Sequence, residues 1–240
     1  MQKQTVLITG ANKGIGYETA RQLGKQGYFV FLGARDEHKG SEAVRRLREE
    51  GIEAAYIRID AADAATIVSA AEQIGAQTSS LDVLINNAGI GAGGNVPSQQ
   101  TIEEIRSVYE VNVFGPIQII QAMLPLLQKA PLGRIVNVSS GLGSLTFNSD
   151  PTHEHYGANP LDYNSSKTAL NAVTVLFAKE FAGTSLKINA VDPGYTATDL
   201  NNNSGTRTVE HSAGTVARLA LIGEDGPSGG FFDENGAIPW

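Results

Sequence analysis

The chain lacks cysteine entirely, although it is 240 residues long. A disulfide framework and a metal site built from thiolates are therefore excluded. Long apolar runs are missing as well: no 18-residue apolar span occurs, and the run Thr5–Ile8 is too short for the apolar region of a signal peptide. We accordingly expect a cytoplasmic protein.

Basic residues are the minority among the charged ones. The chain has 18 Lys and Arg against 25 Asp and Glu, which gives a formal net charge of −7, and no basic stripe stands out. This balance argues against nucleic acid or an anionic membrane as the main partner. With 41% hydrophobic and 18% charged residues, the composition is typical of one soluble domain, which we expect to span residues 1–240.

Short β-branched runs alternate with longer stretches of helical periodicity. Because most of the short runs are continuously apolar, they predict parallel strands that are covered on both faces. The expected fold class is α/β: a doubly wound parallel sheet of about seven strands in a three-layer, Rossmann-type single domain, with ligands at the carboxyl ends of the strands. The predicted strands are Thr5–Thr9, Tyr28–Ala34, Ala54–Ile59, Val83–Asn86, Arg134–Ser139, Lys187–Val191 and Gly230–Phe232, and the predicted helices are Ile15–Gln26, Glu37–Glu50, Ala64–Gly75, Thr101–Gln128, Leu161–Phe181 and Thr206–Leu221.

The stretch after the first predicted strand is rich in glycine. It reads Thr9-Gly10-Ala11-Asn12-Lys13-Gly14-Ile15-Gly16 and leads into a predicted helix. Glycines let the backbone turn tightly and approach a pyrophosphate, to which the helix N-terminus offers free N–H groups. The stretch predicts a dinucleotide-binding turn, although its Gly-x-x-x-Gly-x-Gly spacing differs from the Gly-x-Gly-x-x-Gly fingerprint.

Tyr163 and Lys167 are four residues apart on a predicted helix and therefore share one face. A phenol has an unperturbed pKa of about 10, and a neighbouring ammonium would lower it by favouring the phenolate. The pair is a candidate proton-transfer device. By itself, the spacing also fits a lysine that snorkels beside a half-buried tyrosine.

Several motifs in a fixed order connect these features. The glycine turn is followed by Asn86-Asn87-Ala88-Gly89, Asn112, Ser139-Ser140, Tyr163…Lys167 and Pro193-Gly194. In this combination the chain resembles a short-chain dehydrogenase/reductase, and the resemblance runs from about residue 5 to residue 200.

The resemblance implies a reacting centre of four residues. Tyr163 would donate the proton in carbonyl reduction, and Lys167 would lower the pKa of Tyr163 and bind the nicotinamide ribose. Ser140, in preference to its neighbour Ser139, would bind the substrate oxygen. Asn112 would mark a local helix break that supports a proton relay.

The resemblance also implies NADP(H) as the cofactor. Arg35, directly after the second predicted strand, and Lys13 are cations placed for the 2′-phosphate, which Asp36 would repel if its carboxylate pointed inward. Asp60 is expected either to contact the adenine or to cap the helix that follows. The expected cofactor-binding residues are Gly10, Asn12, Lys13, Gly14, Ile15, Gly16, Arg35, Asp60, Ala61, Asn87, Ala88, Gly89, Tyr163, Lys167, Pro193, Gly194, Thr196 and Thr198.

Two segments at the same edge are expected to shape the substrate site. Residues 195–208 form a predicted substrate lid, in which Thr196 or Thr198 would bond the cofactor, with Thr198 matching the family spacing better. Residues 145–160 form an insertion that resembles, in shortened form, one found in monomeric carbonyl reductases. That likeness leaves a monomer and a homo-oligomer both open.

The insertion contains His153-Glu154-His155, which could be taken for metal ligands. Two histidines two residues apart do not share a helix face as zinc ligands do. We therefore predict a solvated loop and no metal.

The predicted function is the reversible, NADPH-dependent reduction of a ketone or aldehyde to an alcohol, with Tyr163 as the proton donor and a small molecule as the substrate partner. A 3-oxoacyl-thioester reductase is the alternative within enzymes, and a non-catalytic NADP(H)-binding regulator is the alternative outside them. The loops of the expected cleft are apolar and small, which indicates an apolar carbonyl compound. The candidate lining residues are Val96, Leu142, Leu145, Phe147 and Tyr195.

Overall fold

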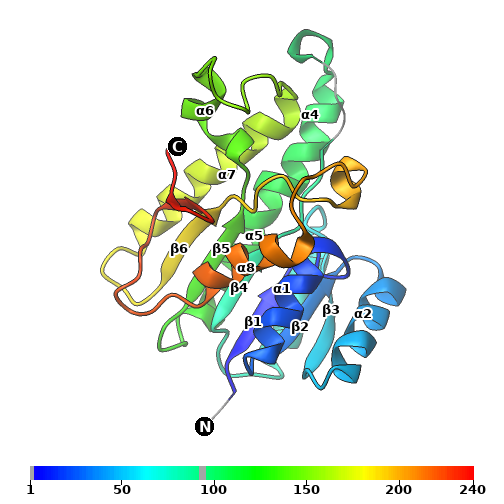
Figure 1. The fold of residues 1–240 in the computed structure, drawn as a ribbon. Coiled ribbons are helices and arrows are strands. Elements are labelled where there is room, and N and C mark those ends of the chain that lie inside the picture. The colour runs from blue at the N-terminus through cyan, green and yellow to red at the C-terminus, as the bar shows by residue number, and fades with distance from the viewer. Residues whose placement is uncertain (1–2, 92–95) are drawn as a thin grey trace.

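One sheet runs through the middle of the structure, a computed structural model that describes residues 3–91 and 96–240 (Figure 1). The strand order is β3-β2-β1-β4-β5-β6-β7-β8, and every neighbouring pair is parallel except β7 and β8. The strands are β1 (Thr5–Ile8), β2 (Phe29–Ala34), β3 (Ala54–Arg58), β4 (Val83–Asn86), β5 (Arg134–Val138), β6 (Lys187–Val191), β7 (Phe231–Asp233) and β8 (Gly236–Ala237).

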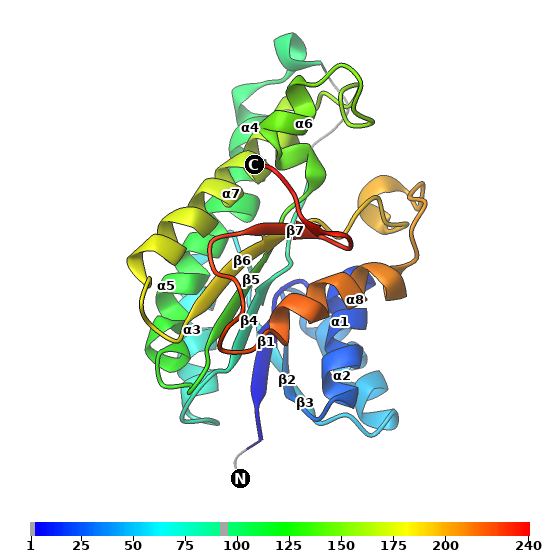
Figure 2. The ribbon, with the colours of Figure 1, turned by 60° about the vertical axis from the view of Figure 1, so that its left-hand side comes forward.

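Helices cover both faces of the sheet (Figure 2). On one face lie α1 (Gly14–Lys25), α2 (Glu37–Glu49) and α8 (Val209–Ala220); on the other lie α3 (Ala64–Gly75), α5 (Gly115–Leu127) and α7 (Leu161–Glu180), with α4 (Ile102–Tyr109) beside α7. Successive strand residues belong to opposite cores: Val6 and Ile8 pack toward the first group of helices, and Leu7 toward the second. Both faces being buried explains why the strands read as continuous apolar runs, and the predicted three-layer α/β fold is confirmed.

The strand order reverses between β1 and β4, which are neighbours in the sheet but distant in the chain. In open α/β sheets this reversal leaves a crevice at the carboxyl ends of the strands. Ile8 pairs with Ile85 across β1 and β4. As a result, the glycine turn after β1 and the Asn86–Gly89 loop after β4 begin next to each other, at the same edge of the sheet.

The long helix predicted for Thr101–Gln128 is divided in the structure. A π-helical turn, Glu110–Phe114, separates α4 from α5 and places Asn112 in the interior. The expectation that no 18-residue apolar span occurs is wrong here: Ile102–Leu127 is long and apolar enough to cross a membrane by composition, but half of its apolar window is buried inside the fold. It packs as a core helix.

Three smaller differences from the prediction concern the last part of the chain. The 145–160 segment contains a short helix, α6 (Leu145–Ser149), where the sequence predicts a loop. Helix α8 begins at Val209, with Thr208 as its cap, rather than at Thr206. Strand β8 is additional to the expected seven, because a hairpin of this length carries too little sequence pattern to predict.

Candidate active site

The glycine turn and the loop after β4 are packed against each other. A methyl group on Gly10, whose φ is +62°, would lie 3.0 Å from the Cα of Ala88. One on Gly16 would lie 2.4 Å from Asn87 Nδ2, which donates to the carbonyls of Thr9 (2.9 Å) and Gly10 (3.2 Å). These contacts bring together the predicted cofactor-binding residues Gly10, Gly16, Asn87 and Ala88.

Helix α1 starts directly after this turn and is not capped by a side chain. Its N-cap residue is Lys13, whose side chain makes no capping hydrogen bond. The first N–H groups of the helix, with the positive end of its dipole, are therefore available to an anion. Asn12 and Ile15, which were also predicted to bind the cofactor, belong to the same turn and are half-buried.

Lys13 has a partner that the sequence did not indicate. Its Nζ lies 2.5 Å from Asp199 Oδ2 in the 195–208 segment. In the same place, a methyl group on Gly14 would lie 3.7 Å from Thr198 Cγ2. The 195–208 segment therefore rests on the glycine turn, and Lys13 is paired across this contact.

Arg35 and Asp36 follow β2, and their side chains have different surroundings. Arg35 is exposed, whereas Asp36 caps α2 by accepting a hydrogen bond from the Lys39 N–H (2.9 Å). This backbone hydrogen bond lowers the pKa of Asp36. Because its carboxylate is committed to the start of α2, the repulsion of a 2′-phosphate considered from the sequence has no basis in the structure.

Asp60 and Ala61 follow β3. Asp60 Oδ1 accepts a hydrogen bond from the Ala62 N–H (3.0 Å), while α3 is capped by Asp63. The interpretation of Asp60 as the helix cap is therefore wrong. Ala61 is buried against Gly115, where an added methyl group would lie 2.6 Å from the Ala61 carbonyl oxygen.

Tyr163 and Lys167 lie one turn apart on α7, opposite the end of β5. The Lys167 side chain is almost fully buried, and its Nζ donates to the carbonyl of Val138 (2.8 Å). It lies 5.6 Å from the centre of the Tyr163 ring. The Ser140 side chain lies close enough to Tyr163 to lower the pKa of the phenol. The structure thus brings Ser140, Tyr163 and Lys167 together.

Burial moves the pKa values of the pair in opposite directions. Desolvation raises the pKa of Tyr163 to about 12, against the lowering by Ser140, and lowers the pKa of Lys167 to about 8. The negative charge of Asp192 raises both pKa values. The predicted lowering of the Tyr163 pKa is wrong for this arrangement, because burial of the phenol outweighs its neighbours.

Asn112 connects the loop after β4 to α7. Its Nδ2 donates to the carbonyl of Ile90 (2.8 Å) and to Ser166 Oγ (3.0 Å), and its Oδ1 accepts from the Ile90 N–H (2.9 Å). A methyl group on Gly89 would lie 3.4 Å from Lys167 Nζ and 3.5 Å from Asn112 Oδ1. The interior position rules out a solvent-facing role for this asparagine.

The two adjacent serines after β5 have different surroundings. Ser139 is buried, and its hydroxyl donates to Asn171 Oδ1 (2.6 Å). Ser140 is half-buried, accepts from the Leu142 N–H (3.2 Å) and faces Tyr163. Ser140 thus lies on the side of Tyr163 and Ser139 on the side of Asn171, while the roles expected for the two serines stay predictions.

The two threonines after Pro193-Gly194 also separate. Thr196 is buried, and its hydroxyl contacts Ser212 Oγ (2.6 Å) and donates to the Gly194 carbonyl (3.0 Å). Of these two threonines, Thr198 is the one that lies against the glycine turn. The ends of the 195–208 segment are joined, since Arg207 donates its N–H to the Tyr195 carbonyl (2.9 Å).

The 145–160 segment is more ordered than a solvated loop. The rings of Phe147 and His153 stack with centroids 4.0 Å apart, and His155 meets both edge-on. The prediction of solvated side chains is thus wrong for the two histidines, which are half-buried, and holds for Glu154 and Tyr156, which are exposed. Over the ranges 3–91 and 96–240, no group of three or more His, Cys, Asp or Glu side chains could hold a metal ion.

Asp192 is the residue near the reacting centre that the sequence reasoning missed. It follows β6 directly and acts electrostatically on both Tyr163 and Lys167. An acidic residue at the carboxyl end of a predicted strand, immediately before Pro193-Gly194, was a signal that could have found it.

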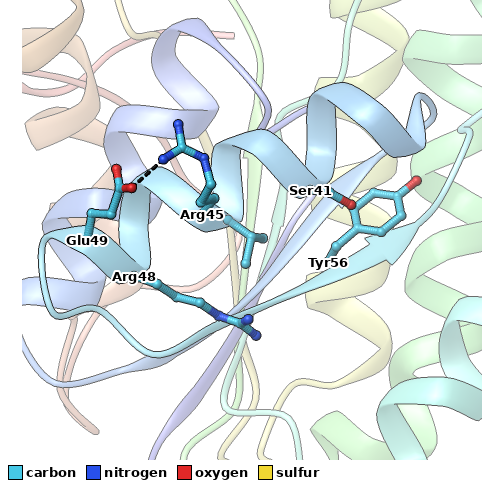
Figure 3. A pocket seen from close by; sticks show the side chains of 6 residues that line it. Ser41, Arg45, Arg48, Glu49 and Tyr56 are labelled. Atoms are coloured by element: carbon cyan, nitrogen blue, oxygen red, sulfur yellow. Dashed lines mark hydrogen bonds and ion pairs between the residues drawn. The ribbon is translucent and has the colours of Figure 1, made fainter.

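A separate groove lies between α2 and β3, away from these residues (Figure 3). Its two arginines already have partners: Arg48 donates twice to the Ala54 carbonyl (2.9 and 2.7 Å), and Arg45 pairs with Glu42 and Glu49. None of the predicted catalytic residues lines it, so the carboxyl ends of the strands remain the place of the candidate site. The lining residues are Ser41, Val44, Arg45, Arg48, Glu49 and Tyr56.

Comparison with known proteins gives matches over nearly the whole chain. The family model described as short chain dehydrogenase matches residues 4–208. A (+)-neomenthol dehydrogenase of Arabidopsis thaliana is 34% identical, over 94% of each chain. The structure of salutaridine reductase from Papaver somniferum superposes with a TM-score of 0.84 at 30% identity, covering 96% of this chain and 99% of that one. An NADPH-bound carbonyl reductase from chicken fatty liver superposes with a TM-score of 0.87 at 29% identity, covering all of both chains.

Proposed function

The chain belongs to the short-chain dehydrogenase family, and from this premise we propose that it is an NADP(H)-dependent oxidoreductase that reduces a ketone or an aldehyde to an alcohol. The observation that carries the proposal is the meeting of Ser140, Tyr163 and Lys167 at the carboxyl end of β5, beside a turn suited to a pyrophosphate. Salutaridine reductase and carbonyl reductase among the similar structures support the reaction class.

Tyr163 is the proton donor of this proposal. With a pKa raised to about 12 by burial, the phenol is fully protonated at neutral pH, which is the form that reduction requires. Ser140, which lies beside Tyr163, is placed to bind the same carbonyl oxygen that Tyr163 protonates. Two donors on one oxygen stabilise the negative charge that develops there during reduction.

Lys167 acts as the cation next to this donor. Its pKa of about 8 leaves it mostly charged at neutral pH, and the hydrogen bond to Val138 fixes its position. Asn112 holds the loop at Ile90 against α7, and so keeps Gly89 beside the ammonium. Asn112 is in this account a positioning residue.

NADPH fits the residues that surround the glycine turn. The uncapped start of α1 suits the pyrophosphate, and exposed Arg35 suits the 2′-phosphate because Asp36 is turned toward α2. The NADPH-bound carbonyl reductase with the same fold supports this choice. When bound, the cofactor supplies the hydride for the carbonyl carbon.

A carbonyl panel with NADPH tests the proposal, and Tyr163→Phe is its decisive variant. We expect turnover to fall by about 10²–10⁴-fold, since a positioned general acid contributes that much, while NADPH binding persists. Oxidation of NADPH by ketones and aldehydes is the readout for turnover, and NADPH fluorescence is the readout for binding.

The same assay separates the two alternatives. Turnover restricted to 3-oxoacyl thioesters would replace the simple carbonyl substrate. Binding of NADPH without oxidation by any compound of the panel would identify a regulator. A Tyr163→Phe variant with unchanged turnover would refute the assigned proton donor.

A further inference from the structure

Two polar side chains converge on the residue that follows Ser140. A methyl group on Gly141 would lie 2.4 Å from His155 Nε2 and 2.9 Å from Asp192 Oδ2. The imidazole and the carboxylate therefore occupy the space that a side chain at position 141 would fill. They come from segments far apart in the chain, the 145–160 segment and the end of β6, and they are close neighbours above Gly141.

Asp192 has one oxygen committed to the fold and one that is not. Oδ1 accepts a hydrogen bond from the Gly194 N–H (2.9 Å), which stabilises the turn after β6. Oδ2, the oxygen near His155, has no hydrogen-bond donor among the residues that the structure describes. The charge of this carboxylate acts on the reacting centre. Burial has the larger effect on both pKa values: it raises that of Tyr163 and lowers that of Lys167. The negative charge of Asp192 raises both.

His155 is held in place by rings of its own segment. Its ring meets Phe147 at 6.1 Å and His153 at 4.9 Å, each at 64°, and its backbone N–H donates to His153 Nδ1 (3.2 Å). Phe147 in turn stacks on His153. The imidazole is thus positioned before any ligand arrives, which lowers the entropic cost of using it for recognition.

The segment itself is tied to the turn that carries Ser140 and Gly141. Asn148 Nδ2 donates to the carbonyls of Leu142 and Ser144, both at 2.7 Å, and Ser144 caps α6 by accepting from the Phe147 N–H (3.1 Å). The position of His155 is therefore coupled to the reacting centre through a short and well-bonded path.

We infer that His155 and Asp192 form a recognition site for a hydroxyl group next to the substrate carbonyl, because both side chains lie over Gly141, the residue that follows Ser140. The inference rests on the proposed carbonyl reduction and names its substrate class as hydroxy ketones. A hydroxyl group can both donate and accept a hydrogen bond. It can therefore donate to Asp192 Oδ2 and accept from the N–H of His155 Nε2. A plain ketone would cover the carboxylate with apolar atoms and leave it without a partner, which costs binding free energy.

Matched substrate pairs test the inference. We compare kcat/KM with NADPH for 2-hydroxyacetophenone against acetophenone, and for 3-hydroxy-2-butanone against 2-butanone. The expected result is a preference of about tenfold or more for the hydroxy ketone of each pair, since a site built to hydrogen-bond a hydroxyl discriminates strongly against its absence.

Two neighbouring residues of the 145–160 segment, His155 and Tyr156, provide the variant and its control. His155→Phe keeps the ring cluster but removes the hydrogen bond, and we expect the hydroxy preference to fall by about tenfold. Tyr156→Phe removes only the hydroxyl of an exposed ring that follows His155 in the chain, and should keep the preference of the original enzyme. Thermal melting of both variants checks that they are equally folded.

Gly141→Ala is a second, independent variant. Its methyl group takes the space of the imidazole and displaces it without removing it. We expect the same loss of hydroxy preference. Equal kcat/KM within each pair for the original enzyme, or an unchanged preference in His155→Phe, would overturn the inference while leaving carbonyl reduction intact. An absence of NADPH oxidation with all four ketones would instead overturn the proposed function and the inference together.

Discussion

The glycine turn and the reacting centre lie on the same edge of the sheet but are built in different ways. At the turn, backbone approaches backbone: Gly10 meets Ala88, and the Asn87 amide binds two main-chain carbonyls. At the reacting centre, side chains from separate segments converge, among them Tyr163 and Asp192. The first kind of site depends on the absence of side chains and the second on their electrostatic surroundings. Substitutions should therefore act on the two through different measurable quantities.

The largest effect on the turn is expected from Gly16→Ala. The added methyl group would lie 2.4 Å from Asn87 Nδ2 and 2.8 Å from the Gly10 carbonyl oxygen, so the turn must shift. We expect a loss of about 1–3 kcal/mol in the free energy of unfolding, as for other overpacked sites, and an NADPH affinity lowered by about tenfold or more. Urea unfolding and NADPH titration measure the two quantities.

Gly75→Ala is the matched control for Gly16→Ala. Gly75 ends α3, and an added methyl group would have no atom within 4 Å. Stability should change by less than about 1 kcal/mol, and NADPH affinity should stay the same. Equal behaviour of the two alanine variants would show that close approach at the turn is unimportant.

Arg35→Ala should separate the two nicotinamide cofactors. Removing the cation proposed for the 2′-phosphate is expected to raise the KM for NADPH by about tenfold, because the lost charge-assisted hydrogen bond contributes roughly 1.5 kcal/mol to binding. The KM for NADH should stay unchanged, since NADH has no 2′-phosphate. Arg45→Ala removes an arginine from the groove on α2 and serves as the control. The assignment would be reversed by equal increases for NADPH and NADH.

The reacting centre should respond to pH rather than to packing. Lys167, with a pKa of about 8, loses its charge as the pH rises through that value, while Tyr163 stays protonated to about pH 12. We therefore expect kcat/KM for reduction to decline above about pH 8. Because the Asp192 charge raises the pKa of Lys167, Asp192→Asn should move this decline to lower pH.

The pH dependence of kcat/KM for NADPH oxidation, recorded for both proteins, checks this expectation. Glu72→Gln is a suitable control, since it removes one negative charge from an exposed position on α3. A profile of Asp192→Asn that declines at the same pH as that of the original enzyme would contradict the electrostatic role of Asp192.

The smallest effect is expected where the 195–208 segment touches the glycine turn, at the ion pair of Lys13 and Asp199. Both side chains are more than half exposed, and pairs of this kind contribute little to stability. Asp199→Asn releases Lys13 for the 2′-phosphate, so NADPH affinity should rise by about twofold to fivefold while the melting temperature stays constant. Lys13→Met should abolish this gain. A lower NADPH affinity in Asp199→Asn would show that the 195–208 segment needs the pair to bind cofactor.

Particular elements show how far sequence patterns reach. The continuous apolar runs predicted β1 to β6 nearly to the residue, because burial on both faces leaves a local signature. The glycine turn and the Tyr163/Lys167 spacing also carried local signals. The division of Thr101–Gln128 at the π-helical turn could be anticipated from the family resemblance of Asn112, but its hydrogen bonds to Ile90 and Ser166 could not.

The sequence by itself determined the doubly wound sheet, the dinucleotide turn and the residues brought to the strand ends, since each depends on neighbours in the chain. Only the tertiary structure decided the direction of the Tyr163 pKa shift, the pairing of Lys13 with Asp199, and the meeting of His155 with Asp192 above Gly141. These outcomes depend on desolvation and on charges from distant segments. Such effects are properties of positions in space, which no local pattern encodes.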